Sequence, residues 1–101
     1  MKTLLNLTFA ALLMGLAPLS FAGDAAVGKA KSVTCAGCHG TNGISNNPMW
    51  PNLAGQKQAY LASSLQMYRD GRRKNAMMSA MAKNLTDADI ANLAAYYSSL
   101  K

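Results

Sequence analysis

Five consecutive residues, from Cys35 to His39, carry the clearest chemistry in the chain; they read Cys-Ala-Gly-Cys-His. The spacing Cys-x-x-Cys-His is typical of covalent attachment of a c-type haem. Two thiols add to the two vinyl groups at one porphyrin edge, and two intervening residues let one backbone turn span that edge. A histidine directly after the second thiol can bind the iron through a neutral imidazole nitrogen. The run therefore predicts one haem c, with its iron, held through two thioethers.

Pairs of cysteines separated by two other residues also occur in dithiol oxidoreductases, zinc sites and disulfides. A dithiol redox motif belongs in a strand–helix–strand setting, and no strand pattern stands near this run. A closed zinc site takes four ligands, whereas the whole chain has 2 cysteines and 1 histidine. A plain disulfide leaves the adjacent His39 without a role. These mismatches favour haem attachment.

A haem iron held by His39 has a second axial position to fill. The chain has no other histidine, so methionine is the available soft ligand. Met67 falls inside an expected helix, where methionine usually fills gaps in the core. Five methionines follow residue 22: Met49, Met67, Met77, Met78 and Met81. The cluster at 77–81 follows that helix, where the chain can return across the other face of the ring.

The first 22 residues have the anatomy of a secretory signal peptide. Lys2 gives a basic opening, residues 4–16 form an apolar run, and small residues stand at positions 20 and 22. An apolar run this short, without a stop-transfer flank, does not favour a membrane anchor. We therefore expect cleavage after Ala22, export to the periplasm, and one domain over 23–101 without stable membrane insertion.

The expected domain is small and has no cysteine outside the haem motif. Domains of this size bury a modest core and often need a metal, a cross-link or a cofactor. Because the haem would supply much of the missing apolar surface, we expect the apo-protein to be largely unfolded.

The chain is basic, with 10 Lys and Arg, 4 Asp and Glu, and a formal net charge of +6. Such charge can serve solubility alone, or it can steer an acidic partner by long-range attraction. No nucleic-acid-binding motif accompanies it, so nucleic acid is not an expected partner. Most basic residues after the haem motif gather in one part of the chain: Lys57, Arg69, Arg72, Arg73, Lys74 and Lys83.

Helix signals recur along the expected domain, and no strand pattern or internal repeat appears. Asp24 can cap a first helix over about 25–34. A second helix over 57–70 has apolar residues three and four apart and ends before Gly71. Thr86 and Asp89 can form a capping box at the start of the last helix. The residues that follow predict an apolar stripe on one face of that helix: Ile90, Leu93, Ala94 and Tyr97.

Two segments between these helices read as irregular. Turn-forming residues crowd 40–56, and this loop is expected to wrap the histidine side of the haem. The methionine-bearing segment 72–85 is expected to be irregular as well. The sequence thus predicts an all-α domain of about three main helices plus irregular loops around one covalently attached haem.

Taken in order, the motifs of the chain resemble those of the class I c-type cytochromes, in their short bacterial periplasmic monohaem group. The chain also resembles one half of the dihaem proteins built from two such domains. The resemblance covers residues 23–101. It rests on these motifs: Asp24-Ala25-Ala26-Val27-Gly28, Cys35-x-x-Cys38-His39-Gly40, Pro51-Asn52-Leu53-Ala54-Gly55-Gln56, the methionine segment, and Leu85-Thr86-Asp87-x-Asp89-Ile90 before Ala94-Ala95-Tyr96-Tyr97.

The resemblance implies a role for four residues on the histidine side. Cys35 and Cys38 would carry the haem, and His39 would be the proximal ligand of the iron. The carbonyl of Pro51 would accept the proton of the other ring nitrogen of His39, which fixes the ring and raises its basicity.

The resemblance also implies a distal ligand seven residues before the leucine that precedes the last helix. Counting back from Leu85 gives Met78, with Met77 and Met81 as alternatives. In addition, Gly28 would let the first helix pack closely against the last one near Tyr97.

The resemblance implies a periplasmic one-electron carrier and not an enzyme, because two axial side chains leave no open position on the iron. The expected partners are acidic redox proteins or membrane respiratory complexes, met in transient docking. The alternative is a haem protein with an open distal site that acts as a sensor or a peroxidase-type enzyme. A thiol oxidoreductase that uses Cys35 and Cys38 as free thiols is a further rival.

Overall fold

The computed structural model describes residues 22–101, which fold into five α helices. No strand occurs among these residues, so the all-α prediction is confirmed. None of the helices in this part of the chain is long and apolar enough to cross a membrane. The expected signal peptide lies outside the described residues, except for Ala22. The helices are α1 (Ala25–Lys31), α2 (Val33–His39), α3 (Gln58–Asp70), α4 (Ala76–Ala82) and α5 (Asp87–Ser99).

The expected first helix over 25–34 is divided at Ser32, and the haem motif itself is helical. The Asp24 side chain caps α1 by accepting from the backbone N–H groups of Ala26 and Val27. Ser32 ends α1, because its hydroxyl donates to Lys29 O at 2.7 Å and its N–H is shared between two α1 carbonyls. This local competition for the backbone separates α1 from α2.

Gly28 lets α1 approach α5 at backbone distance. A Cβ atom at this position would lie 1.9 Å from the Asn92 carbonyl oxygen and 2.9 Å from Tyr96 Cβ. The expected close packing on the last helix is present, and the nearest atoms belong to Asn92 and to Tyr96, the neighbour of Tyr97. The backbone N–H of Asp24 also donates to Asn92 Oδ1 at 2.8 Å, which ties the start of α1 to the same helix.

The last helix is the centre of the core. Its predicted capping box is present: Thr86 Oγ1 accepts from the Asp89 N–H, and Asp89 Oδ2 accepts from the Thr86 N–H, both at 3.0 Å. The predicted apolar stripe is buried, with Ile90, Leu93, Ala94 and Tyr97 all 3% exposed or less. Leu61 of α3 packs against this stripe and joins α3 to α5.

The segment 72–85, expected to be irregular, contains the helix α4. Asn75 caps this helix, because its Oδ1 accepts from the Met78 N–H at 3.0 Å. The residues that follow Asn75 are alanine, methionine and serine, which tolerate or favour helix. Contact with α3 supplies the tertiary support that a seven-residue helix needs in water.

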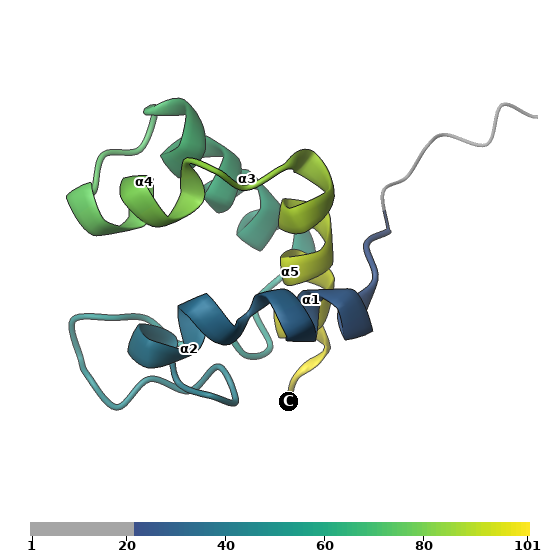
Figure 1. The fold of residues 1–101 in the computed structure, drawn as a ribbon. Helices are drawn as coiled ribbons and strands as arrows, with labels where there is room; N and C mark the ends of the chain where they lie inside the picture. Colours follow the sequence, from purple (N-terminus) through teal and green to yellow (C-terminus); the bar gives the residue numbers. More distant parts are fainter. Residues whose placement is uncertain (1–21) are drawn as a thin grey trace, which may run out of the picture.

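The five helices leave α2 and α4 on different sides of the domain (Figure 1). α1 and α5 pack on each other, α3 packs on α5, and α4 packs on α3. α2 continues from α1 and is followed by the long irregular loop. Among the described helices, α2 makes no packing contact with α3 or α4. α1, α3 and α5 thus form a frame that carries α2 on one side and α4 on the other, and these two helices do not contact each other.

Candidate functional site

Cys35 and Cys38 lie one turn apart on α2. Residues three positions apart in a helix share a face, so both thiols can reach the same edge of one ligand. Both side chains are partly buried, and neither forms a disulfide. Burial raises the pKa of the Cys35 thiol, partly offset by a hydrogen bond with Thr34. The helix therefore presents two unpaired sulfur atoms at the spacing of two thioethers.

His39 is the last residue of α2 and is only 6% exposed. Its Nδ1 lies 2.8 Å from the carbonyl oxygen of Pro51. A carbonyl can only accept a hydrogen bond, so Nδ1 carries the ring proton and Nε2 keeps its lone pair. This is the arrangement that orients a metal-binding imidazole and raises its basicity.

The loop that carries Pro51 is held in place by backbone contacts. Gly43 is buried with φ +74°, and its carbonyl oxygen accepts from the N–H groups of Leu53 at 2.8 Å and Ala54 at 3.0 Å. Ser45 joins the loop to the haem motif, because its hydroxyl donates to Cys38 O at 3.3 Å. The irregular loop over 40–56 thus follows the histidine side as expected, and its shape fixes where the Pro51 carbonyl points.

Tyr97 contacts Cys35 from α5, a contact that the sequence reasoning did not foresee. The tyrosine is 3% exposed, and its hydroxyl lies close to the side chains of Ser32 and Cys35. Burial raises the pKa of this hydroxyl well above its ordinary value. The signal in the sequence was a tyrosine on the apolar stripe of the last helix, since a buried tyrosine hydroxyl needs a partner.

The methionines of α3 and α4 lie on helices that make no contact with α2, the helix of His39. Met77, Met78 and Met81 are all on α4, with Met78 partly buried and the other two 56% and 48% exposed. Met67 is partly buried on α3, whereas Met49 is 82% exposed in the loop after α2. The structure therefore offers three thioethers from one helix, on a side of the domain that has no helix contact with α2.

These donors fit an iron porphyrin better than a bare metal ion. Nowhere in residues 22–101 do three or more His, Cys, Asp or Glu side chains gather to hold a metal. A porphyrin brings four nitrogen ligands of its own, so the protein needs only axial ligands and anchors for the ring. His39, the two cysteines and the thioethers of α4 are such a set, and the exposed apolar methionines suit the face of a flat apolar ring.

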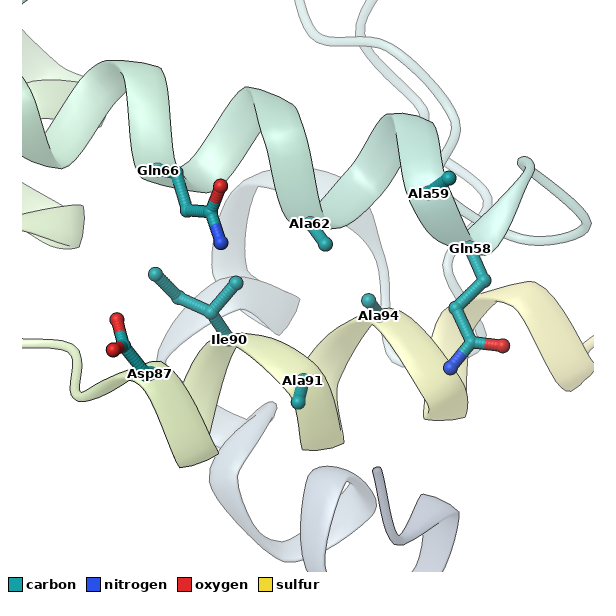
Figure 2. A pocket seen from close by; sticks show the side chains of 8 residues that line it. All are labelled: Gln58, Ala59, Ala62, Gln66, Asp87, Ile90, Ala91 and Ala94. Atoms are coloured by element: carbon teal, nitrogen blue, oxygen red, sulfur yellow. The ribbon is translucent and has the colours of Figure 1, made fainter. Parts of the chain in front are cut away.

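Two hollows occur among the described residues, and neither is lined by His39 or by a methionine of α4. One, of about 470 Å³, runs between α3 and α5 and contains none of the predicted site residues (Figure 2). Alanines form most of its floor, with Gln58, Gln66 and Asp87 at its edges. The other, of about 270 Å³, lies beside Cys38 between α2 and Trp50 of the loop.

Comparison with known proteins agrees with this site. Residues 25–101 match the family model described as Cytochrome c. Cytochrome c-554(548) of Halomonas halodenitrificans is 56% identical over 81 residues, which cover 77% of this chain and 98% of that protein. Cytochrome c4 of Pseudomonas aeruginosa is 43% identical over 100 residues, which cover 99% of this chain and 49% of that protein.

A solved structure shows the same fold. The reduced recombinant cytochrome c4 from Pseudomonas stutzeri superposes with a TM-score of 0.75 at 40% identity, covering 79% of this chain and 47% of that chain. The chain spans about half the length of these c4 relatives. The all-α fold, the Cys-x-x-Cys-His run and the family match together assign haem c with its iron as the cofactor. The chain belongs to the cytochrome c family, whose members are electron carriers.

Proposed function

We propose that the protein is a periplasmic one-electron carrier in which Cys35 and Cys38 hold the haem and His39 and Met78 are the axial ligands. The observation that carries this proposal is the 2.8 Å contact between His39 Nδ1 and Pro51 O. It leaves Nε2 of a buried imidazole as the metal-binding nitrogen, directly after two unpaired cysteines. An oriented histidine can also act as a catalytic base, but two cysteines at the Cys-x-x-Cys-His spacing directly before it favour haem attachment.

The residues of the chain divide the work of holding the cofactor. When bound, the haem iron supplies a one-electron couple between its ferric and ferrous states. His39 is oriented by the loop, and the two cysteines fix the ring edge on α2. A methionine opposite a histidine raises the reduction potential relative to two imidazoles. With a side chain on each face, no position remains for oxygen or peroxide, which is why we propose a carrier and not an enzyme.

Met78 is favoured among the methionines of α4 by its place in the helix. It is the partly buried one of the three, while Met77 and Met81 are about half exposed. Its backbone N–H donates to Asn75 Oδ1, so the helix cap holds the turn of α4 that carries Met78. A side chain on a capped turn is better positioned than one on a free loop.

Export is part of the proposal. The family match begins at residue 25, just after the segment that we interpret as a signal peptide. We propose that residues 1–22 direct the chain to the periplasm and are removed, and that residues 23–101 work there without insertion into the membrane. The basic charge of residues 23–101, with nine Lys and Arg against four Asp and Glu, supports transient docking to acidic redox proteins or membrane respiratory complexes.

Carbon monoxide separates the carrier from a haem protein with an open distal site. We expect the reduced exported protein to bind carbon monoxide slowly or not at all at neutral pH. The Met78→Ala variant should bind it readily, because the distal position is then open. Fast binding by the unaltered protein would favour the sensor or peroxidase-type alternative instead.

A further inference from the structure

The three arginines at the end of α3 and in the turn that leads to α4 differ in whether a carboxylate neutralises them. Arg69 pairs with Asp87 at 2.7 Å and with Asp70 at 3.4 Å, and it also donates to Leu85 O. Arg72 pairs with Asp70 at 3.2 Å. These two guanidinium groups therefore have their charge satisfied within the domain.

Arg73 is held as firmly but is not neutralised. Its backbone N–H donates to Met67 O at 3.1 Å, which fastens the turn to the end of α3. Its guanidinium lies 4.7 Å from the centroid of the Tyr68 ring, and its Nη1 donates to Ser64 Oγ at 3.4 Å. A hydrogen bond with Arg73 also lowers the pKa of Tyr60. Among residues 22–101, no carboxylate forms an ion pair with Arg73, and the residue is exposed.

An exposed cation with a fixed position is suited to bind an anion. A flexible surface lysine loses side-chain freedom when it binds, whereas the Arg73 guanidinium is already ordered by the side chains of α3. A guanidinium offers several N–H donors in one plane, and a carboxylate can accept two of them. Arg73 also stands in the turn that leads into α4, the helix that carries Met78.

We infer that Arg73 is the anion-recognition residue of the electron-transfer docking surface, and that it binds a carboxylate of an acidic redox partner. This inference rests on the proposed electron-carrier function and names the contact through which a partner is recognised. Arg69 and Arg72 contribute less to this recognition, because Asp70 and Asp87 already compensate their charges.

Two other roles would also explain a fixed arginine. Arg73 can serve only to fasten the turn through its contacts with Tyr68 and Ser64. It can also serve the carboxylates of the haem itself. The first role predicts an effect on stability alone, and the second predicts an effect on the reduction potential.

The test uses the haem-loaded protein and the variants Arg73→Gln, Arg73→Lys and Arg72→Gln. Arg73→Gln and Arg72→Gln change the net charge equally, so they form a matched pair. Stopped-flow oxidation of the reduced protein is measured with an anionic probe, hexacyanoferrate(III), and a cationic probe, tris(phenanthroline)cobalt(III), over a range of salt. A nuclear magnetic resonance titration with a short polyglutamate peptide locates carboxylate binding without any redox step.

We expect Arg73→Gln to slow oxidation by the anionic probe about fivefold or more at low salt, with a flatter salt dependence. Arg72→Gln should slow it less than about twofold, and Arg73→Lys should lie between them. Oxidation by the cationic probe should not slow in any variant. The peptide should shift the backbone resonances of residues 71–75, and Arg73→Gln should remove that shift.

Three results would overturn the inference. The first is equal slowing by Arg73→Gln and Arg72→Gln, which would mean that only net charge acts. The second is a changed midpoint potential in Arg73→Gln with unchanged peptide binding, which would assign the arginine to the haem. The third is a lowered melting temperature with unchanged rates and binding, which would leave a structural anchor. If the electron-carrier function itself fails, the unaltered protein will reduce neither probe, whatever the peptide titration shows.

Discussion

The two sides of the domain are built in different ways. The histidine side, residues 32–56, contains no Asp, Glu, Lys or Arg and consists of α2 and an irregular loop. The methionine side, residues 57–85, consists of α3, a turn and α4, and it has six basic residues against one acidic residue. The polypeptide therefore concentrates its charge on one side of the proposed iron site and keeps the other side uncharged.

The contrast shows how each side positions its ligand. On the histidine side, two backbone carbonyls set the position of the ligand: the Gly43 carbonyl organises the loop, and the Pro51 carbonyl holds His39, while the Ser45 hydroxyl adds one side-chain link to Cys38. On the methionine side, side chains do it, through the Asn75 cap and the Arg69–Asp87 ion pair that ties α3 to the start of α5. Backbone bonds fix one tautomer of one imidazole, whereas capped helices carry a soft ligand together with surface charge.

Removal of both thioethers should have the largest effect, because the two sides have no helix contact of their own. We expect Cys35→Ser with Cys38→Ser to lose the haem and most of the helical signal in far-ultraviolet circular dichroism. A single Cys35→Ser variant, which keeps one thioether, is the matched control and should retain the fold. A double variant without haem that keeps a native-like spectrum would show that the domain needs no cofactor to join its sides.

The next effect should fall on the methionine side alone. In Met78→Ala we expect loss of the sulfur-to-iron charge-transfer band at the red end of the ferric spectrum. The reduction potential should fall on the order of 0.1 V, within the roughly 0.8 V that axial ligands span. Met77→Ala and Met81→Ala are the controls and should keep the band. Survival of the band in Met78→Ala would move the ligand to one of these neighbours.

Two glycines with positive φ, one on each side, allow the stability cost of an added side chain to be compared between the two sides. Gly40 has φ +88° and Gly71 has φ +78°. A Cβ at Gly40 would lie 2.0 Å from the Ile44 carbonyl oxygen, whereas a Cβ at Gly71 meets nothing within 4 Å. Gly71→Ala should therefore cost only the backbone strain, about 1–2 kcal/mol of unfolding free energy. Gly40→Ala should cost about 2–6 kcal/mol, since Gly40 has φ +88° and ψ 151°, a conformation open mainly to glycine that costs other residues about 1–3 kcal/mol, and overpacking adds about 1–3 kcal/mol.

Chemical denaturation of the two haem-loaded variants gives the comparison. It is informative only where both variants retain haem, which the visible spectrum reports. Equal unfolding free energies for Gly40→Ala and Gly71→Ala would mean that the loop after α2 yields as easily as the turn after α3.

The smallest effect on stability should come from a change in the capping box of α5, which belongs to the frame that carries both sides. A hydrogen bond from the Thr86 N–H lowers the pKa of Asp89, with a lesser contribution from Lys31 at 3.5 Å. A lowered folded-state pKa stabilises the fold above the unfolded-state value, about 3.9, and this stabilisation is lost as the pH falls through the folded-state value. Asp89→Asn should cost about 0.5–1 kcal/mol at neutral pH, as loss of a helix cap does.

Denaturation at several pH values tests this prediction. The stability difference between Asp89→Asn and the unaltered protein should shrink as the pH falls below about 4. The reduction potential should stay the same, because α5 begins away from both axial ligands. A difference that does not depend on pH would show that the carboxylate charge of Asp89 plays no part.

The features that could be predicted from the sequence are those with local chemical signals. The capping box at Thr86 and the stripe from Ile90 to Tyr97 depend on residues within a few positions, and both are present. The stop at Gly71 depends on one left-handed residue, and its φ of +78° agrees. These elements decide most of the all-α architecture.

The features that the sequence did not predict depend on competition for backbone hydrogen bonds or on contacts between distant parts of the chain. Ser32 divides the first helix because its side chain competes for an α1 carbonyl, and alanine-rich periodicity does not reveal such competition. α4 is too short to be stable by propensity and depends on contact with α3, although Asn75 was a local signal for its start. The contact of Tyr97 with Cys35 joins residues far apart in the chain and has no local signal.

The central claim is that one haem, bonded to both Cys35 and Cys38, joins the uncharged side to the basic side. The most direct test is the intact mass of the exported protein, measured under denaturing conditions. We expect a single species with the mass of residues 23–101 plus one haem, and no free thiol. A mass equal to the bare polypeptide, with both thiols reactive, would contradict it.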